Sequence, residues 1–428
     1  MLRFASSPTG DMHINDLRVA LYNYLLANKK NEDLVIRIED SDNKNNIEGK
    51  DQEILDLLAL FNIHYSQVIY QSQNARFHAA MALQLLHEKK AFSCFCSPEW
   101  IEQKKQEAKT AQKNYHYDDA CRNLPAELVI DNTAPFTIRI VRPSKSIVFH
   151  DKIVGDVSFD PDSVDSFTIM HQDKTATSDF ASAIDDMLSD ISIVVCEQNY
   201  LQNTSRQIHI RNQLAYKKEI EYAHIPIITN KSDNDMQLNV KWLLEEGFLP
   251  EAISNYLISI GNETPSKIFT LDEAQEWFTL ETLTNSPTHF DINVLKHINR
   301  EHLKMMDSKE LSRYVGFADT DIGELAKVYL QEAVTTKELK SKIAPIFDTV
   351  RNIPKNLEKE VQLIAEAIKQ APYFENYDEF TKHIIKETEV EGEKLIKSLH
   401  VLFTNREDGP EISKIYDHLK NYLGEIIK

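Results

Sequence analysis

The chain has 428 residues, of which 42% are hydrophobic, enough for two to four packed units and too many for a disordered chain. Its net charge is −19, and residues 301–428 carry 19 Lys and Arg against 24 Asp and Glu, so no basic tail favours tight nucleic-acid binding. No stretch approaches the roughly 18 apolar residues of a spanning helix, and no secretory signal is visible. We therefore expect a cytoplasmic protein that binds neither membranes nor DNA.

The first ninety residues follow a strand–helix–strand pattern. Residues 2–5 are short and apolar, SSPTG is typical of a turn, and Asn15 or Asp16 is expected to cap a helix through LRVALYNYLLANK. LVIRI at 34–38 predicts a second strand, so the sheet is expected to be parallel. Amphipathic helices are expected at 53–61 and 75–90.

The pattern changes after residue 90 and again after residue 290. Between 91 and 160 the segments FTIRIV and SIVFHD predict strands of an inserted α+β unit. Helical spacing resumes at 179–188, 191–196 predicts a buried strand, and 240–261 predicts a helical pair around Gly247 and Pro250. Beyond 290 nearly all of the sequence has helical spacing.

Several segments together resemble the glutamyl-tRNA synthetases, class I enzymes that join glutamate to tRNA with ATP. They are RFASSPTG, ALYNYL, RIEDSD, SFTIMHQDKTATSDFASAIDD, YAHIPII, the helices of 240–261 and THFDINVLKHIN. The resemblance covers nearly the whole chain and is greatest to the second paralogue of some bacteria.

The resemblance implies a fold class and four domains. The fold would be an α/β Rossmann-type catalytic domain with an inserted α+β acceptor-binding-like domain, followed by an all-α anticodon-binding-like domain. The Rossmann domain would comprise 1–90 and, together with stem-contact helices, 161–289. The zinc- and acceptor-stem-like insertion would span 91–160, and the helical domain 290–428.

The family's first catalytic landmark is His-[Ile/Val]-Gly-x, where a helix N-terminus meets the ATP phosphates. This chain has His13, Ile14, Asn15 and Asp16 there. Asn15 places an amide where the nucleotide would pack, and Asp16 would repel a phosphate by ~4 kcal/mol at 4 Å and an effective dielectric of 20. The alternative for His13 is a loop histidine with no catalytic task.

The second landmark is Lys-x-Ser-Lys-Arg, whose cations stabilise the charge that develops on the phosphates. The chain has only TNKSDNDMQLN between YAHIPII and VKWLLEEGF, which places Ser232 on the motif serine. Lys231 survives nearby, while Asp233 and Asn234 stand where the second lysine and the arginine belong. The alternative is a shortened surface turn.

The amino-acid pocket of the family is half present. Arg3, Ala5, Ser7 and Glu39 match positions that hold the α-amino and α-carboxyl groups. A pocket tyrosine is replaced by Ser178, and the arginine that binds the substrate's side-chain carboxylate is replaced by Cys196. Cysteine cannot form a bidentate pair with a carboxylate, so glutamate specificity is expected to be lost. The alternative for Arg3 and Glu39 is an internal ion pair.

A structural zinc site is also expected from the resemblance. Cys94, Cys96 and Cys121 match the spacing of zinc ligands in some members, with Tyr117 as the fourth ligand and His116 as its rival. Three thiolates and a phenolate suit tetrahedral Zn²⁺. The alternative is three buried free thiols.

These substitutions favour a pseudo-synthetase that keeps the scaffold and binds tRNA or a protein partner, such as an active paralogue. The alternative is an active ligase that charges tRNA-Glu or tRNA-Gln with glutamate, and only then are ATP and Mg²⁺ expected as cofactors. A third reading, the short paralogues that glutamylate a modified tRNA base, is disfavoured because those proteins lack an anticodon domain.

Overall fold

The computed structural model describes residues 1–41, 44–112, 115–230 and 238–427. The chain forms two compact units. The first comprises residues 1–240, 257–265 and 270–290, and the second comprises 241–256, 266–269 and 291–428. The division proposed from the sequence at 90, 160 and 289 stays a prediction.

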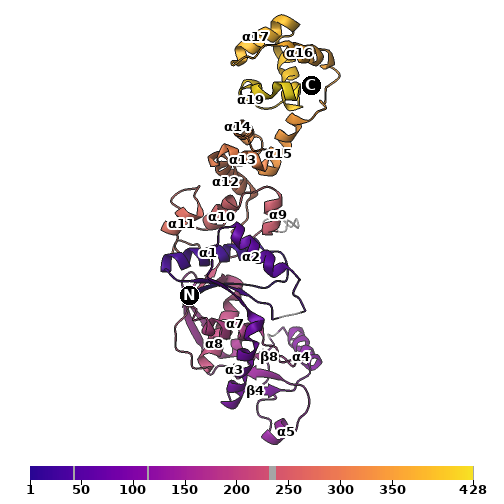
Figure 1. The fold of residues 1–428 in the computed structure, drawn as a ribbon. Coiled ribbons are helices and arrows are strands. Elements are labelled where there is room, and N and C mark those ends of the chain that lie inside the picture. The colour runs from indigo at the N-terminus through magenta and orange to yellow at the C-terminus, as the bar shows by residue number, and fades with distance from the viewer. Residues whose placement is uncertain (42–43, 113–114, 231–237, 428) are drawn as a thin grey trace. The chain divides into compact units, whose positions relative to one another are not determined.

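The first unit is built on a seven-stranded sheet of order β3-β2-β1-β9-β10-β6-β7, drawn in Figure 1. All neighbours pair in parallel except β6 and β7. The strands are β1 (Leu2–Ser6), β2 (Leu34–Ile38), β3 (Gln67–Tyr70), β6 (Ile147–Asp151), β7 (Gly155–Phe159), β9 (Ile193–Glu197) and β10 (Glu221–Ile225). The predicted Rossmann-type sheet is therefore present, and β2 has its predicted bounds.

Helices connect these strands, as a parallel sheet requires. They are α1 (Ile14–Lys30), α2 (Lys50–Leu60), α3 (Ala75–His87), α7 (Ser178–Leu188) and α8 (Leu201–Gln213). The predicted cap of α1 is wrong by two or three residues, because His13 and not Asn15 or Asp16 occupies the N-cap position. Its Nδ1 accepts a hydrogen bond from the Asn15 backbone N–H at 3.1 Å.

A second, three-stranded sheet has the order β4-β5-β8 (Ala91–Cys94, Thr137–Ile140, Thr168–Met170). The segment SIVFHD, expected in the insertion, forms β6 and pairs with β10 of the main sheet instead. Conversely, β8 lies beyond residue 160 yet pairs with β5. Hydrophobic spacing identified β6 but carried no information about its partner, and β8 was not predicted.

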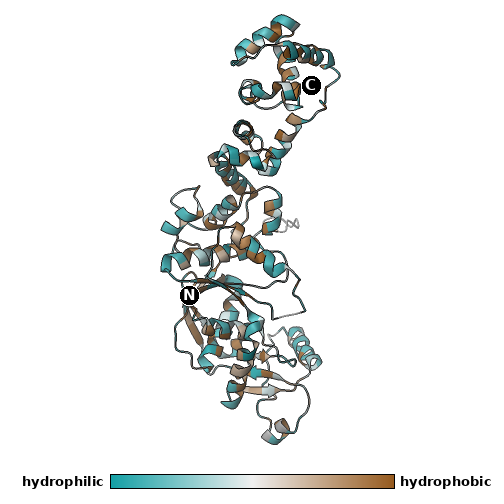
Figure 2. Ribbon diagram, viewed as in Figure 1, coloured by the Kyte–Doolittle hydropathy of each residue, from teal (hydrophilic) through white to brown (hydrophobic). Residues whose placement is uncertain are grey.

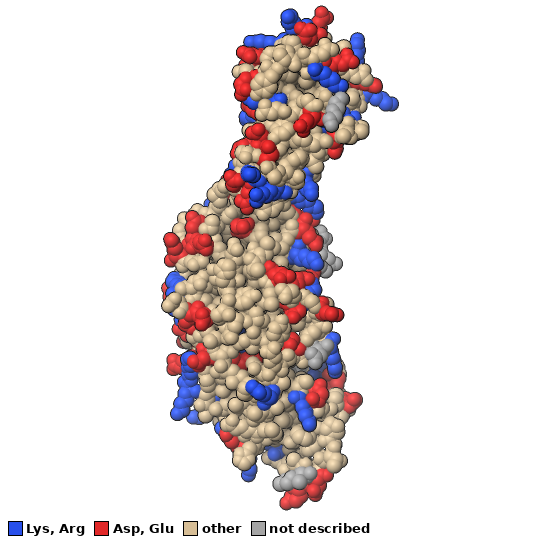
Figure 3. Space-filling model, viewed as in Figure 1, with Lys and Arg blue, Asp and Glu red and all other residues tan. Residues whose placement is uncertain are grey.

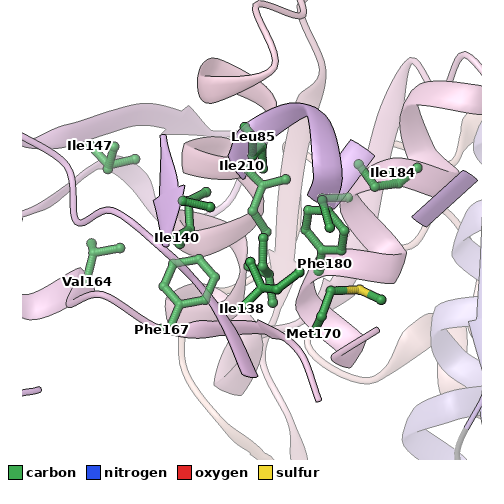
Figure 4. Close-up of a cluster of buried hydrophobic side chains, with 14 residues drawn as sticks. Leu85, Ile138, Ile140, Ile147, Val164, Phe167, Met170, Phe180, Ile184 and Ile210 are labelled. Carbon is green, nitrogen blue, oxygen red and sulfur yellow. The ribbon is translucent and has the colours of Figure 1, made fainter. Parts of the chain in front are cut away.

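The small sheet shares its core with the helices of the main sheet. Figure 4 shows Ile138, Ile140 and Met170 packed with Phe180 and Ile184 of α7, and the same buried cluster includes Leu85 and Ile210. The polar helix α4 (Pro98–Thr110) and the short α5 (Ala126–Ile130) complete this region. The insertion is thus part of one compact unit.

Beyond the sheets, the first unit contains the two-stranded pair β11 (Ile228–Thr229) and β12 (Thr288–His289), the short helix α6 (Pro161–Val164) and helix α11 (Leu271–Trp277). Helices α9 (Val240–Glu245) and α10 (Pro250–Ser259), of which the greater part belongs to the second unit, are the predicted pair of 240–261.

The second unit is helical, as predicted. Its helices are α12 (Ile292–Met305), α13 (Ser308–Tyr314), α14 (Thr320–Val328), α15 (Thr336–Ile343), α16 (Glu358–Gln370), α17 (Tyr377–Thr388), α18 (Gly392–Thr404), α19 (Ile412–Leu419) and α20 (Leu423–Ile426). Gly323 lets α14 approach α13, because a Cβ there would lie 1.7 Å from the Ser308 carbonyl oxygen. Phe380, Phe403 and Tyr416 form an aromatic core.

The placement of apolar and charged side chains agrees with the composition of the chain. In Figure 2 the apolar residues of the amphipathic helices lie largely on their inner faces. On the face shown in Figure 3, acidic and basic side chains are interspersed, with no extended basic area among the described residues. No helix in the described part of the chain is long and apolar enough to cross a membrane.

Candidate active site

Helix α1 begins at the carboxyl end of β1, and its first turn carries three of the residues singled out from the sequence. His13 caps the helix, and its backbone N–H donates to Asp16 Oδ2 at 3.1 Å, so the two residues form a capping box. Burial lowers the pKa of His13, although the Asp16 carboxylate opposes this shift. The first turn is therefore a well-formed helix start with an acidic side chain.

Asn15 has a structural role that the sequence did not indicate. Its side chain is buried, its Oδ1 accepts from the Ile228 backbone N–H at 2.9 Å, and its Nδ2 donates to the Ile228 carbonyl at 3.3 Å. Two backbone hydrogen bonds flank this contact, from Ile14 to the Leu238 carbonyl and from Val240 to the Met12 carbonyl. The amide thus ties α1 to β11 and is fully engaged within the protein.

A cavity of about 330 Å³ opens at the carboxyl ends of β1 and β9. This edge of a parallel sheet, where the strand order reverses, is the usual ligand site of such folds. The cavity brings together seven residues predicted from the sequence, although they come from five separate segments. They are Arg3, Ala5, Ser7, Asp16, Glu39, Ser178 and Cys196. His13 does not line it.

Buried ion pairs form the floor of this cavity. Arg3 Nε and Arg37 lie 3.0 and 2.6 Å from the Asp186 carboxylate, and Arg37 also contacts Glu39 at 3.2 Å. Burial opposes ionisation of Asp186, but Arg3, Arg37 and Arg211 hold its pKa at about 2. An ion pair between Arg3 and Glu39, the alternative considered from the sequence, is not what the structure shows, because each pairs with another residue.

Glu197 is a cavity residue that the sequence analysis missed. It lies next to Cys196 at the end of β9 and lines the same cavity as Asp16. Burial, followed by the charge of Asp16, raises the pKa of Glu197, and burial raises the pKa of Asp16. Tyr200 is also in this lining, and its pKa is raised by burial and by Glu197. The position of Glu197 directly after the predicted strand 191–196 was the signal that could have identified it.

The predicted metal ligands gather at the end of β4. The thiol sulfurs of Cys94, Cys96 and Cys121 all lie within 4.8 Å of one another, with 3.6 Å between the last two. The Tyr117 hydroxyl is 3.3 Å from Cys94 Sγ and 3.4 Å from Cys96 Sγ. His116 is exposed and outside the cluster, which favours Tyr117 of the two rivals.

These four atoms fit a tetrahedral zinc ion. Zn–S bonds of about 2.3 Å would place the sulfurs about 3.8 Å apart, close to the 3.6 Å between Cys96 and Cys121. A nearly buried cation, Arg139, lies beside the cluster, with its Nε 3.3 Å from Cys94 Sγ and its guanidinium 4.1 Å from the centre of the Tyr117 ring. Burial raises the pKa of the Cys94 thiol, but hydrogen bonds from Tyr117, the Cys96 backbone and Arg139 more than offset this.

The second catalytic landmark cannot be assigned a geometry. Lys231, Ser232, Asp233 and Asn234 lie outside the residues that the structure describes.

A parallel sheet with β1 between β2 and β9, a polar cavity at their carboxyl ends and a helix starting there together define a Rossmann-type enzyme fold. Residues 1–297 match the family model "tRNA synthetases class I (E and Q), catalytic domain". The chain therefore belongs to the glutamyl- and glutaminyl-type class I tRNA synthetases.

Relatives of full length are similar to it. The "Glutamate--tRNA ligase 2" of Sulfurimonas denitrificans is 57% identical, and the "Glutamate--tRNA ligase 1" of Nitratiruptor is 47% identical, each over 100% of both chains. The solved glutamate tRNA ligase from Elizabethkingia meningosepticum shares the fold, with a TM-score of 0.83 and 21% identity over 100% of this chain and 98% of that one. The expected family and fold class are confirmed.

Proposed function

We propose that the chain is a tRNA-binding pseudo-synthetase, whose ligation of glutamate to tRNA is lost or very weak. One observation carries this proposal: Asp16 and Glu197 line the same cavity at the start of α1. Their raised pKa values reflect burial of both carboxyls, and in Glu197 also the charge of Asp16.

A bound nucleotide would add its own negative charge to that of these two carboxyl groups. A helix N-terminus attracts phosphates through its free N–H groups, but here the His13 and Asn15 N–H groups already donate to side chains of the same turn. A triphosphate 4 Å from one carboxylate would meet a repulsion of ~4 kcal/mol at an effective dielectric of 20. The described residues therefore do not fit ATP.

Calorimetry tests this part of the proposal directly. Wild-type protein should show no binding of ATP at micromolar concentrations, and the double variant Asp16→Asn, Glu197→Gln should gain at least tenfold in affinity. Glu276→Gln, an exposed position on α11, is the matched control and should change nothing. Micromolar ATP binding by the wild type would refute the charge argument.

The alternative is an active glutamate–tRNA ligase using ATP and Mg²⁺. It is supported by the names of the relatives and by the cavity, which still contains Arg3, Ala5, Ser7 and Glu39. Pyrophosphate exchange with ATP and glutamate, measured in the presence of tRNA, separates the two functions. Turnover within tenfold of an ordinary synthetase would establish the ligase.

The cysteine cluster is proposed to hold one structural zinc ion through Cys94, Cys96, Cys121 and Tyr117. A closed shell of four protein ligands would leave no position for substrate, so the ion would brace the loops that follow β4. Metal analysis of the purified protein should give one zinc per chain. A fully folded, zinc-free sample would refute the assignment.

tRNA is the proposed partner, and a larger cavity offers a place for its end. This cavity, of about 1200 Å³, shares Ser7, Glu39 and Ser178 with the smaller one. Lys105 and Arg139 contribute positive charge to its lining. We propose that residues 91–160 form the acceptor-stem-like part and residues 290–428 the anticodon-binding-like part. If the chain does not bind tRNA, its remaining proposed role is to bind a protein partner, such as an active paralogue.

A further inference from the structure

The smaller cavity opens where two neighbouring strands of the main sheet stop pairing. Among the described residues, β1 and β9 are paired in parallel only at Leu2 and Ile193. The residues that follow on both strands line the cavity instead. Its volume of about 330 Å³ is at the lower end of the range of ligand pockets, ~300–1,000 Å³, which favours a ligand of the size of a single amino acid.

The floor of the cavity carries arginines with free N–H groups. Arg3 is only 6% exposed, and its Nε donates to Asp186 Oδ1 at 3.0 Å. It makes no other hydrogen bond with the described residues, which leaves its two terminal nitrogens for a ligand. The equally buried Arg37 lines the same cavity, and its Nε has no hydrogen-bond partner among the described residues. A planar guanidinium is suited to a carboxylate, because its forked N–H groups match the two oxygens.

The mouth of the cavity carries two carboxyl groups without a cation. Asp16 accepts the His13 backbone N–H, and Glu197 accepts a hydrogen bond from the Asn199 side chain. Neither makes an ion pair with a described residue. The pKa values of Asp16 and Glu197 are raised by burial, and that of Glu197 also by the charge of Asp16, as expected of buried carboxyl groups that no cation neutralises.

The other two carboxylates of the lining already have cationic partners. Asp179 pairs with Arg206 at 3.2 Å, and Glu39 pairs with Arg37 at 3.2 Å. The unbalanced negative charge of the cavity is therefore confined to the first turn of α1 and the end of β9. The free N–H groups lie at the opposite end, on β1 and β2.

The two ends of the cavity are far enough apart to hold opposite charges of one small molecule. The register aligns Leu2 with Ile193. Arg3 follows the first of these by one residue and Glu197 follows the second by four, so their levels differ by three residues along the strands. At ~3.3 Å per residue this is roughly 10 Å. Since both side chains line the cavity, a ligand with an anion at one end and a cation at the other can contact both.

We propose that this cavity binds a free α-amino acid with a cationic side chain, such as arginine or lysine. The α-carboxylate accepts hydrogen bonds from Arg3, and the side-chain cation lies at Asp16 and Glu197. Tyr200 of the same lining adds an aromatic ring, to which cations are attracted. The inference rests on the proposed function, because an active glutamate ligase would need the same cavity for glutamate.

Calorimetry on the full chain tests the proposal with ligands that differ in one charged group. Arginine should bind at least tenfold more tightly than citrulline, which has the same length and a neutral side chain, and lysine should exceed norleucine by the same factor. Agmatine, which lacks the carboxylate of arginine, should also bind at least tenfold more weakly. If neither cationic amino acid binds more tightly than its neutral analogue, the proposal is overturned. Agmatine binding as tight as that of arginine would overturn the role of Arg3.

A variant then tests the cationic end of the site. Glu197→Gln should weaken arginine binding at least tenfold without lowering the melting temperature of the free protein. Glu276→Gln, at the exposed position on α11, should leave arginine affinity within twofold of wild type. Unchanged arginine affinity in Glu197→Gln would overturn the role of this carboxylate, and if the variant does not fold, the comparison of ligands decides.

The ATP titration and pyrophosphate exchange described above decide the proposed function separately. If wild-type protein binds neither ATP nor a cationic amino acid, this inference fails and the pseudo-synthetase proposal stands. If it turns over glutamate like an ordinary synthetase, both fail.

Discussion

The carboxylate of Asp16 serves the fold and, in the proposed function, opposes a nucleotide with the same group. It closes the capping box of α1 by accepting the His13 N–H, and it points its charge into the cavity shared with Glu197. Caps of this kind contribute about 0.5–2 kcal/mol to helix stability. The proposed replacement of a phosphate site by a cap is thus compatible with a stable protein, whereas the surroundings of Glu197 disfavour the ionised form of its carboxyl group.

Neutralising Glu197 should stabilise the protein in a pH-dependent way. Because its folded pKa is raised above the unfolded value, ionisation of this carboxyl destabilises the fold as pH rises above about 4.3, the ordinary value for glutamate. Glu197→Gln should therefore melt a few degrees higher than wild type at pH 7 and at the same temperature at pH 4. Glu276→Gln provides the control. An equal gain at both pH values would contradict the charge argument.

Arg139 should set the zinc affinity of the cysteine cluster. Three thiolates and a phenolate around Zn²⁺ leave a net negative charge, which the guanidinium beside Cys94 and Tyr117 partly neutralises. Groups that contact metal ligands in this way typically change affinity 10–100-fold. Arg139→Gln should weaken zinc binding by about this factor in chelator competition. Arg142→Gln, at an exposed arginine paired with Asp162, should leave it unchanged.

At the scale of elements, the sequence motif did not indicate the hydrogen bonds between Asn15 of α1 and Ile228 of β11. Asn15 was singled out because the family has a glycine there, and the expected consequence concerned the nucleotide. The structure shows instead an amide that pairs with both backbone groups of Ile228, 213 positions away in the chain. A short motif shows that a residue is unusual, but its partner is set by the folded chain.

Asn15→Ala should consequently destabilise the protein by about 1–3 kcal/mol, since it leaves the buried N–H and C=O of Ile228 without partners. Urea unfolding followed by circular dichroism measures the change. Asn28→Ala, at an exposed position in the last turns of α1, should stay within about 0.5 kcal/mol of wild type. If both variants changed the free energy of unfolding equally, the hydrogen bonds of Asn15 to Ile228 would contribute nothing to stability.

The strands themselves were predictable to different degrees. β2 was found at its bounds because LVIRI is short, β-branched and followed by polar residues. β6 was found but assigned to the wrong sheet, because alternation specifies a buried face and not a neighbour. Cys196 was noticed as a missing arginine, whereas His224 and Asp151 behind it belong to strands that only the fold brings together.

At the scale of the whole molecule, the charge of −19 limits how the chain can hold tRNA. A protein with a net negative charge can bind a polyanion only through local positive groups, such as Lys105 in the lining of the larger cavity. It then makes few phosphate contacts. The proposed tRNA complex should accordingly be weak and of modest salt dependence.

Electrophoretic shifts with total tRNA between 50 and 200 mM salt should show a log–log slope shallower than roughly −4, corresponding to about four phosphate contacts. Lys105→Gln should reduce that slope by about 1. Lys217→Gln, at an exposed lysine between α8 and β10, is the control. No shift at 50 mM would leave a protein partner as the role, and a steep slope would contradict the charge reasoning.

The shared core of the small sheet has a consequence for how the chain can be divided. Ile138, Ile140 and Met170 cover the apolar faces of Phe180 and Ile184, so deleting the insertion would expose the helices on which the main sheet depends. Expression of the N-terminal half without residues 91–140, which include β4 and β5 but leave β6 and β7 of the main sheet, should yield an insoluble product. A miniaturised version of this protein would have to be trimmed from other surfaces.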